Sequence, residues 1–468
     1  MTELMRCLYC GHLQDEPTGV KECQRCGGEL IYEEPPPKKG KGSYLDAQME
    51  LDQINAPAGQ TVDRHLLISF RTPEKVPAVH LAKTESGRPP LSFSAVLDTS
   101  GSMHGNKIDY TKQALRMASR FFRDGDQFAM TVFSDTAEMI MKPTPVDRES
   151  KKVFESLVNE IMPHGLTALH SGLDLGIQQA QQMRSESNLT LLLSDGQANV
   201  GETDLEIIGT LARKAAEAGL IVSTLGVGMD YNEALMTEIA TQGRGRFYHV
   251  QSAAEIVPYL TGELGEAADL AARDVKIHIK LPKGAALVPL SAAYQCEIID
   301  NEAIVSIGDI PVDLDVEIPL RLTLFPGKEN DRLEINGEIT YLTPAGTTLT
   351  TSLNRVTVRF IKKGHFSPDM GVVKPVATRV AEQMRATQVL QYSRAVSRGN
   401  ETELQHAEHE RLKLREYFQL LDEDIRDKMD QKLTADIHSV RSASPRAKST
   451  VRDAYQAQRF MRNFKDKK

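Results

Sequence analysis

Three oxygen-bearing side chains follow an apolar run in the segment Leu91–Met103, which reads LSFSAVLDTSGSM. Asp98, Ser100 and Ser102 have the spacing D-x-S-x-S. They come after Phe93–Leu97, a run typical of a buried parallel strand. A carboxylate and two hydroxyls are ligands that a hard divalent cation such as Mg²⁺ prefers. The spacing therefore predicts a metal-binding loop at the end of a strand.

Two pairs of cysteines near the N-terminus have the spacing of a zinc site. They are Cys7, Cys10, Cys23 and Cys26. Each C-x-x-C pair is followed by glycine, and twelve residues separate the pairs. Four thiolates complete a tetrahedral Zn²⁺ shell, and a redox dithiol would not need two matched pairs. We predict a zinc ribbon over residues 1–32, with His12 as a bystander because the shell is already full.

The loop that begins at Asp98 resembles the metal-ion-dependent adhesion site (MIDAS) of von Willebrand factor type A (VWA) domains, because residues 98–102 read DTSGS. Two further motifs follow in the order found in that family: GLTAL at 165–169 and LSDG at 193–196. The resemblance implies that three loops share one ion, Mg²⁺ or, in its place, Mn²⁺ or Ca²⁺. The implied ligands are Asp98, Ser100, Ser102, Thr167 and Asp195.

A magnesium ion held by these groups would keep one coordination position open. Mg²⁺ retains water readily, and two protein carboxylates balance its charge, so a Glu or Asp of a partner protein is the natural last ligand. The alternative, in which the serines only cap the next helix, leaves the matching Thr167 and Asp195 unexplained. The sequence contains no G-x-S-x-G elbow, phosphate-binding GK[ST] loop or H-E-x-x-H helix. We therefore predict that the chain is not an enzyme.

Alternating apolar strands and amphipathic helices over residues 91–265 predict a doubly wound, Rossmann-like α/β domain with a mostly parallel sheet. The expected strands are Ser92–Leu97, Gln127–Phe133, Ala137–Met141, Leu189–Leu193, Leu220–Leu225 and Arg246–Val250. A three-residue turn before Ala137 forces this strand to pair antiparallel with its predecessor. Ligands of such sheets bind beyond the carboxyl ends of strands where the strand order reverses, so Asp98 and Asp195 should share one edge.

A second region alternates apolar and polar residues with a period of two, which is typical of half-buried strands. Residues 44–90 contain two such strands, too few for a stable sheet, and residues 266–365 continue the pattern with Pro-Gly and Asn-Gly turns. We predict one antiparallel β-sandwich made from both segments, with the α/β domain inserted into it. Some relatives in the VWA family have a similar nested arrangement.

The remaining segments differ in composition. Residues 33–43, EEPPPKKGKGS, have nothing to bury and predict a linker. Residues 366–440 predict a helical region of two or three packed helices. Residues 441–468 carry nine Lys/Arg against two Asp/Glu and predict a basic tail, whereas the whole chain carries a net charge of −8.

The bulk composition agrees with several soluble domains. The chain has 468 residues, of which 40% are hydrophobic, enough for ordinary cores. No window approaches twenty consecutive apolar residues, and the first residues contain no apolar signal core. From these features we expect a cytoplasmic protein without membrane insertion.

Three functions remain open at this point. The leading prediction is a scaffold that binds an acidic residue of a partner protein through a magnesium-occupied MIDAS. The second is a subunit of a nucleic-acid-associated assembly that uses the zinc ribbon and the basic tail, although the acidic body argues against it. The third is a regulatory partner of an AAA+ ATPase, a role that the resemblance to VWA relatives implies.

Overall fold

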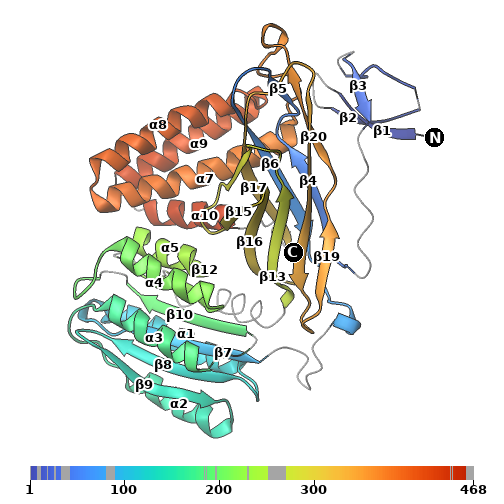
Figure 1. Ribbon diagram of the computed structural model, residues 1–468. Coiled ribbons are helices and arrows are strands. Elements are labelled where there is room, and N and C mark those ends of the chain that lie inside the picture. Colours follow the sequence, from blue (N-terminus) through green and yellow to red (C-terminus); the bar gives the residue numbers. More distant parts are fainter. Residues whose placement is uncertain are drawn as a thin grey trace.

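The computed structural model arranges the chain in an α/β domain, a long β region with helices beside it, and a small N-terminal sheet (Figure 1). The residues that it describes are 2–7, 12–17, 19–25, 28–32, 43–80, 90–183, 185, 187–195, 198–228, 231–250, 270–442, 444 and 446–459. Within these ranges, no helix combines the length and the apolar character that crossing a membrane requires.

The α/β domain is built on a six-stranded sheet of order β12-β11-β10-β7-β8-β9. The strands are β7 (Leu91–Asp98), β8 (Gln127–Phe133), β9 (Ala137–Pro145), β10 (Ser187–Ser194), β11 (Ile221–Val227) and β12 (Arg244–Val250). Neighbouring strands run parallel except β8 and β9, which are antiparallel. The six predicted strands and the antiparallel β9 are therefore confirmed.

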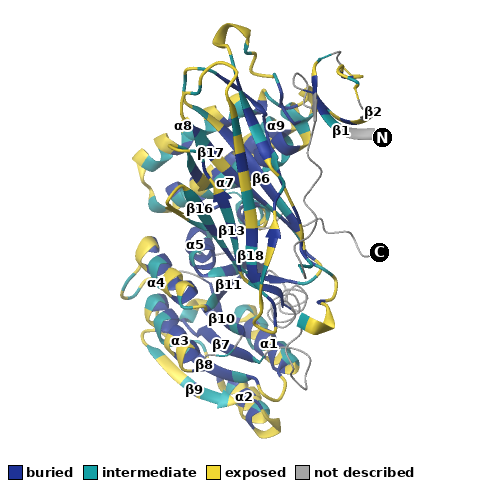
Figure 2. Ribbon diagram, turned by 45° about the vertical axis from the view of Figure 1, so that its right-hand side comes forward, coloured by how far each residue is buried: buried dark blue, intermediate teal, exposed yellow. Residues whose placement is uncertain are grey.

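Helices cover both faces of this sheet. They are α1 (Asn106–Phe121), α2 (Arg148–Glu160), α3 (Leu169–Met183), α4 (Leu205–Glu217) and α5 (Glu233–Gln242). One apolar core lies under α1 and α2, and a second lies under α3, α4 and α5. Every residue of β7 is buried between these layers, and Figure 2 shows the central strands dark blue between helices with exposed outer faces, whereas the edge strand β9 is largely exposed. The strand that ends at Asp98 is thus held from both sides.

Two sheets form the β region. One has the order β14-β17-β6-β4, and the other has the order β15-β16-β13-β18-β20-β5 with β19 paired to β18. Their bounds are β4 (Asp46–Leu51), β5 (Asn55–Pro57), β6 (Val62–Arg71), β13 (Leu270–Lys280), β14 (Ala286–Pro289), β15 (Gln295–Ile299), β16 (Glu302–Pro311), β17 (Asp315–Leu324), β18 (Arg332–Leu342), β19 (Thr348–Ser352) and β20 (Val356–Ile361).

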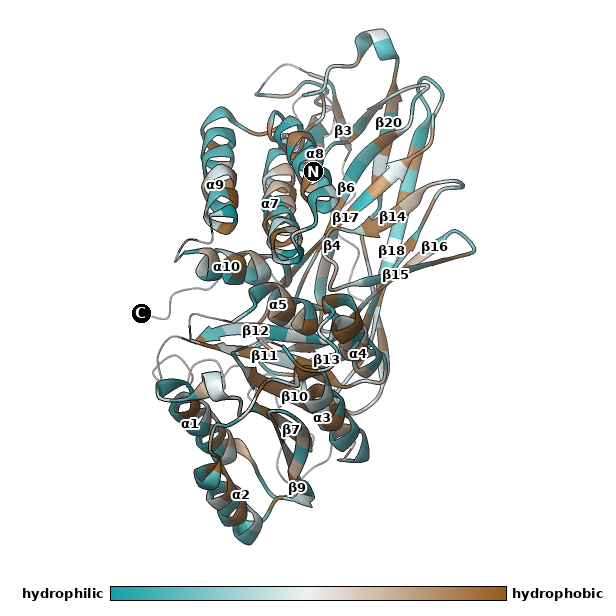
Figure 3. Ribbon diagram, turned by 90° about the vertical axis from the view of Figure 1, so that its left-hand side faces the viewer, coloured by the Kyte–Doolittle hydropathy of each residue, from teal (hydrophilic) through white to brown (hydrophobic). Residues whose placement is uncertain are grey.

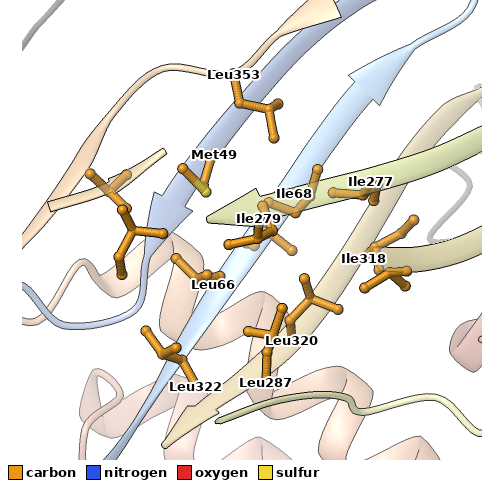
Figure 4. Close-up of a cluster of buried hydrophobic side chains, with 14 of the residues drawn as sticks. Met49, Leu66, Ile68, Ile277, Ile279, Leu287, Ile318, Leu320, Leu322 and Leu353 are labelled. Atoms are coloured by element: carbon orange, nitrogen blue, oxygen red, sulfur yellow. The ribbon is translucent and has the colours of Figure 1, made fainter. Parts of the chain in front are cut away.

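Strands from before and after the α/β domain pair with each other in this region. β6 runs antiparallel to β17 along its whole length, from Val62 opposite Leu324 to Arg71 opposite Asp315. The apolar side chains of both sheets form one core, which includes Ile68 of β6 and Ile279 of β13 (Figure 4). The period-two alternation read from the sequence corresponds to this inward-facing set.

Helices pack beside the β region. They are α7 (Lys374–Arg398), α8 (Glu401–Phe418), α9 (Glu423–Arg441) and α10 (Ala447–Arg459). α7 ends at Gly399, whose φ of 59° is left-handed, and the side chain of Asn400 then accepts hydrogen bonds from the first turn of α8. Gly399 and Asn400 thus form the break between α7 and α8.

The structure differs from the predicted basic tail over residues 447–459, which form α10. Val451, Ala454 and Tyr455 are buried, because α10 lies between α7 and α9 on one side and α5 and β12 of the α/β domain on the other (Figure 3). The Tyr455 hydroxyl donates a hydrogen bond to the carbonyl oxygen of Gly245 at 2.8 Å. Residues 460–468 of the predicted tail lie outside the described part.

Ion pairs also join helices α7 and α10 to the α/β domain. Arg394 of α7 pairs with the buried Glu238 of α5, and Arg398 pairs with Glu206 of α4 at 2.9 Å. Lys448 of α10 pairs with Glu233 at 2.9 Å. The last helices therefore contact the face of the α/β domain formed by α4, α5 and β12.

The N-terminal sheet has three short strands in the order β2-β1-β3. They are β1 (Thr2–Cys7), β2 (Leu13–Pro17) and β3 (Leu30–Tyr32). Residues 33–42, which belong to the predicted linker, lie outside the described ranges.

Candidate metal centre

The predicted ligands Asp98 and Asp195 come from adjacent strands. Asp98 ends β7, and Asp195 follows the last residue of β10. These two strands are parallel, with Leu97 opposite Leu193, so both carboxylates lie at the same edge of the sheet. From β7 the chain continues to β8 on one side, whereas β10 lies on the other, and the strand order therefore reverses between β7 and β10. This is the place where sheets of this class bind ligands.

The first loop brings its oxygen atoms together around Asp98, which is fully buried. One carboxylate oxygen, Oδ1, accepts a hydrogen bond from the backbone N–H of Ser100 at 2.8 Å, and the other, Oδ2, accepts one from the Ser194 hydroxyl at 2.5 Å. The hydroxyl oxygens of Ser100 and Ser102 are 3.0 Å apart. The loop thus gathers one carboxylate and two hydroxyls, as the spacing D-x-S-x-S predicts.

Asp195 is also fully buried, and its two oxygens differ. Oδ2 accepts a hydrogen bond from Nζ of Lys107 at 3.1 Å. Oδ1 has no hydrogen-bond partner among the described residues. An unsatisfied buried carboxylate oxygen is costly, and buried charges in proteins are normally paired or bound to a metal.

The two carboxylates influence each other electrostatically. Burial raises the pKa of Asp98, hydrogen bonds from Ser100 and Ser194 lower it, and the nearby Asp195 raises it again, for a value of about 6. The ionised form of Asp98 is therefore less stable than it would be in water. A bound cation would stabilise this form.

The second loop, residues 161–168, is tied to the first by backbone hydrogen bonds. The N–H of Gly101 donates to the carbonyl oxygen of Gly165 at 2.9 Å, and the N–H of His164 donates to that of Thr99 at 2.6 Å. Gly165 has a φ of +70°, and a Cβ there would lie 2.1 Å from Oδ2 of Asp135. Only glycine fits this turn, which leads directly to Thr167.

Thr167 is tied to the third loop. It is 2% exposed. Its backbone N–H donates to Oδ1 of Asn199 at 2.8 Å, and its carbonyl oxygen accepts from the N–H of Asn199 at 3.1 Å. The structure therefore joins the three predicted loops, and it places all five predicted ligands on them.

These residues fit a hard divalent cation. The donor set consists of carboxylate and hydroxyl oxygens, and one buried carboxylate oxygen lacks a partner within the described part of the chain. Over the same ranges, no group of three or more His, Cys, Asp or Glu side chains could hold a metal by itself. A metal at this edge would therefore depend on the hydroxyls as well as on the two carboxylates.

Sequence reasoning did not find two residues of this site. Ser194 directly precedes Asp195, and its hydroxyl holds Asp98. Lys107 lies in the first turn of α1 and reaches Asp195 across the sheet edge. No local sequence pattern links Lys107 to Asp195, because the two residues are 88 positions apart.

The cysteines near the N-terminus are partly described. Cys7 and Cys23 are buried, and each donates its backbone N–H to the carbonyl oxygen five residues later, to His12 at 2.9 Å and to Gly28 at 2.8 Å. The N–H of Arg25 donates to the sulfur of Cys23 at 3.4 Å. The two knuckles therefore begin in the same way. Cys10 and Cys26 lie outside the described residues, so the four-cysteine site stays a prediction.

Comparison with protein families matches residues 94–262 to the von Willebrand factor type A domain. The chain is 28% identical over 214 residues to "Uncharacterized protein YfbK" of Escherichia coli (strain K12), which covers 45% of this chain and 37% of that protein. It is 25% identical over 298 residues to inter-alpha-trypsin inhibitor heavy chain H3 of Bos taurus, which covers 61% of this chain and 30% of that protein. The chain thus spans about a third of the length of these curated relatives.

Two solved structures share the fold over most of the chain. The structure titled "von Willebrand factor type A from Catenulispora acidiphila" has a TM-score of 0.61 at 15% identity and covers 86% of this chain and 91% of that one. The ArnB paralog VWA2 from Sulfolobus acidocaldarius has a TM-score of 0.54 at 16% identity and covers 89% of this chain and 99% of that one. At these identities the likeness concerns the fold alone.

Proposed function

We propose that this chain, which contains a VWA domain at residues 94–262, is a non-enzymatic scaffold that binds an acidic residue of a partner protein through a metal ion. The ion is Mg²⁺, with Mn²⁺ or Ca²⁺ as substitutes. Its ligands in this proposal are Asp98, Ser100, Ser102, Thr167 and Asp195.

The observation that carries this proposal is Oδ1 of Asp195, which has no hydrogen-bond partner within the described ranges and lies next to Asp98, a carboxyl group whose pKa is raised to about 6. Two buried carboxylates at one sheet edge repel each other, and a divalent cation between them would offset both charges. Mg²⁺ rarely takes all its ligands from protein, so a carboxylate from outside can complete its shell. A relative is named as the heavy chain of an inhibitor, and this name agrees with an interaction role.

Two further parts of the proposal concern the frame around this site. We propose that Cys7, Cys10, Cys23 and Cys26 bind one Zn²⁺, which the matching turns at Cys7 and Cys23 support. We also propose that the VWA domain is inserted in a β-sandwich, which the pairing of β6 with β17 supports. Zinc released by a thiol-reactive mercurial and measured with a chromogenic chelator should reach one equivalent per chain.

Direct metal titration tests the central proposal. The full chain, stripped with chelator, should bind one Mn²⁺ at the VWA domain by calorimetry, and Asp98→Ala should abolish this binding. Asp124→Ala is the matched control, because Asp124 is exposed in the turn before β8, at the opposite edge of the sheet. Capture of a partner should then require the divalent ion and Asp98. Equal metal binding by the wild type and Asp98→Ala would rule out this site.

The two alternative functions receive no specific support. Two basic residues of α10 have partners within the chain, since Lys448 pairs with Glu233 and Arg452 with Asp453. A regulatory partner of an AAA+ ATPase differs from the proposed scaffold only in the identity of the partner, which the capture experiment would reveal.

A further inference from the structure

Lys107 brings a positive charge to the candidate metal centre from outside its three loops. Its Nζ lies 3.1 Å from Oδ2 of Asp195. The side chain of Lys107 is 18% exposed and that of Asp195 is 1% exposed, so water screens this ion pair little.

The path of the Lys107 side chain is shaped by the end of β11. A Cβ at Gly228 would lie 2.7 Å from Cε of Lys107, and Gly228 has a φ of +85°. The glycine therefore leaves the space through which the methylene chain passes to reach the sheet edge. Gly228 is itself held by a hydrogen bond from its N–H to the carbonyl oxygen of Val250 at 3.0 Å. The methylene chain of Lys107 thus packs against Gly228 beside the site.

From this geometry we propose that Lys107 is a resident counter-cation: it stabilises the metal-free site and thereby weakens divalent metal binding at Asp195. This inference rests on the proposed function. Without a metal, the lysine offsets one of the two buried carboxylate charges. When a divalent ion binds, the ammonium group and the ion are two like charges close to the same carboxylate, and their repulsion is strong in a poorly hydrated site. The lysine is a positioning residue, because it acts through Asp195.

A purely supporting role of Lys107 predicts the opposite sign. If the lysine only holds Asp195 in the orientation that a metal needs, its removal would weaken metal binding. If it competes with the metal, its removal would strengthen metal binding. The sign of the change therefore separates the two roles.

The experiment measures Mn²⁺ binding to the full chain by titration calorimetry at one pH near neutral. Lys107→Met keeps the length of the side chain without the charge and should bind Mn²⁺ at least about tenfold more tightly. Lys107→Arg keeps the charge and should stay within about threefold of the wild type. Lys112→Met is the matched control on α1, because Nζ of Lys112 donates to the carbonyl oxygen of Asn159, in α2, and it should leave metal binding unchanged.

Thermal unfolding gives a second readout that does not depend on a partner. Metal-free Lys107→Met should unfold at a lower temperature than the wild type, because two buried carboxylates then lack a cation, and saturating Mg²⁺ should remove this difference. If the methionine variant does not fold without metal, Lys107→Gln takes its place.

The outcomes separate this inference from the proposed function. Metal binding by the wild type, with unchanged or weaker binding by folded Lys107→Met, would overturn the counter-cation role and leave the proposed function intact. Absence of metal binding in the wild type and in both neutral variants would refute the proposed function itself. Metal binding that appears only in Lys107→Met would support the counter-cation role and would contradict metal-dependent docking by the wild type.

Discussion

Asp52 in the β region and Asp98 in the α/β domain are both buried aspartates, yet they differ in the hydrogen-bond partners and charges around their carboxylates. Both oxygens of Asp52 are paired: Oδ1 accepts from the N–H of His65 at 2.8 Å, and Oδ2 lies 2.7 Å from Nδ1 of His65 and 2.9 Å from the hydroxyl of Tyr417. Asp98 has hydrogen bonds too, but it faces a second carboxylate, Asp195, whose Oδ1 has no partner in the part of the chain that the structure describes. We call the cluster of Asp52, His65 and Tyr417 closed, because both carboxylate oxygens have partners. We call the cluster of Asp98 and Asp195 open, because Oδ1 of Asp195 has no partner among the described residues.

The pKa values express this difference. Burial acts to raise the pKa of both groups. At Asp52, His65 and then Arg64 outweigh burial, and the pKa lies below its usual value. At Asp98 the hydrogen bonds do not outweigh it, and the pKa rises to about 6. The aspartate side chain thus joins elements at Asp52, whereas at Asp98 we propose that it binds a cation. This contrast can be tested by mutating each cluster.

The largest effect on stability is expected from Asp52→Ala, which removes the carboxylate of the closed cluster. Removing one partner of a buried, paired network leaves His65 and Tyr417 unsatisfied, so we expect a loss of about 3–5 kcal/mol in the stability of the β region. Urea unfolding followed by circular dichroism measures it. Asp46→Ala, at an exposed position of β4, should have little effect. Because Asp52 belongs to the β region, Mn²⁺ binding should persist in Asp52→Ala; its loss would mean that the two clusters are coupled.

The second effect concerns the open cluster. Asp98→Asn keeps the shape of the side chain and removes its charge, so Mn²⁺ affinity should fall at least about a hundredfold. The stability of the metal-free protein should not fall, because a buried charge beside Asp195 has been removed. Calorimetric titration and metal-free urea unfolding measure the two quantities. If metal-free Asp98→Asn lost as much stability as Asp52→Ala, the carboxylate of Asp98 would contribute to stability as that of Asp52 does, and the contrast between the two clusters would be wrong.

A smaller effect is expected for Tyr417→Phe in α8. This change removes the hydrogen bond from the hydroxyl to Asp52 and leaves His65 in place. Hydrogen bonds to charged groups contribute about 1.5–3 kcal/mol, so stability should decrease by about 1.5 kcal/mol. Urea unfolding with the single and double variants of Asp52 and Tyr417 gives the coupling between them. Additive losses would contradict a shared network.

The smallest effect is on the pH dependence of metal binding. A protonated Asp98 cannot bind a metal, and its pKa is about 6, so Mn²⁺ affinity should fall about tenfold between pH 7.5 and pH 5. By the same linkage, the folded metal-free state binds more protons than the unfolded chain between about pH 4 and 6, so its stability should fall as the pH rises through this window. Titrations at several pH values, with circular dichroism to verify folding, provide the test. A constant affinity would remove Asp98 from the ligand set.

The open cluster could be predicted from the sequence, whereas the closed one could not. Asp98 and Asp195 each follow an apolar strand, and parallel strands bring their carboxyl ends to one edge. The strand Gln127–Phe133 was predicted with the bounds that the structure has, because both of its ends lie at turns. Tyr417 and Asp52 are 365 residues apart in the sequence, and no local sequence pattern predicts the hydrogen bond between them.

The basic residues near the C-terminal end also led to a wrong prediction of local structure. The basic residues of 447–459 favoured a solvated tail, although Val451, Ala454 and Tyr455 have the spacing of one helical face. Their burial depends on α7 and β12, which cover that face only in the folded chain. In the same way, Lys107 occupies a polar helix position whose partner, Asp195, is supplied by another strand 88 residues away.

The pairing of β6 with β17 has a consequence for synthesis on the ribosome. The two strands are far apart in the chain, since the Thr323 hydroxyl of β17 bonds to Asp63 of β6 over 260 residues. β6 emerges first but stays without β17 until the whole α/β domain has been made, and its apolar residues Leu66 and Ile68 are meanwhile uncovered. The α/β domain can form earlier, from its own consecutive strands. α10 then packs against α5 and β12 of this domain. β6 is thus made before the α/β domain but pairs with β17 only after that domain has been synthesised.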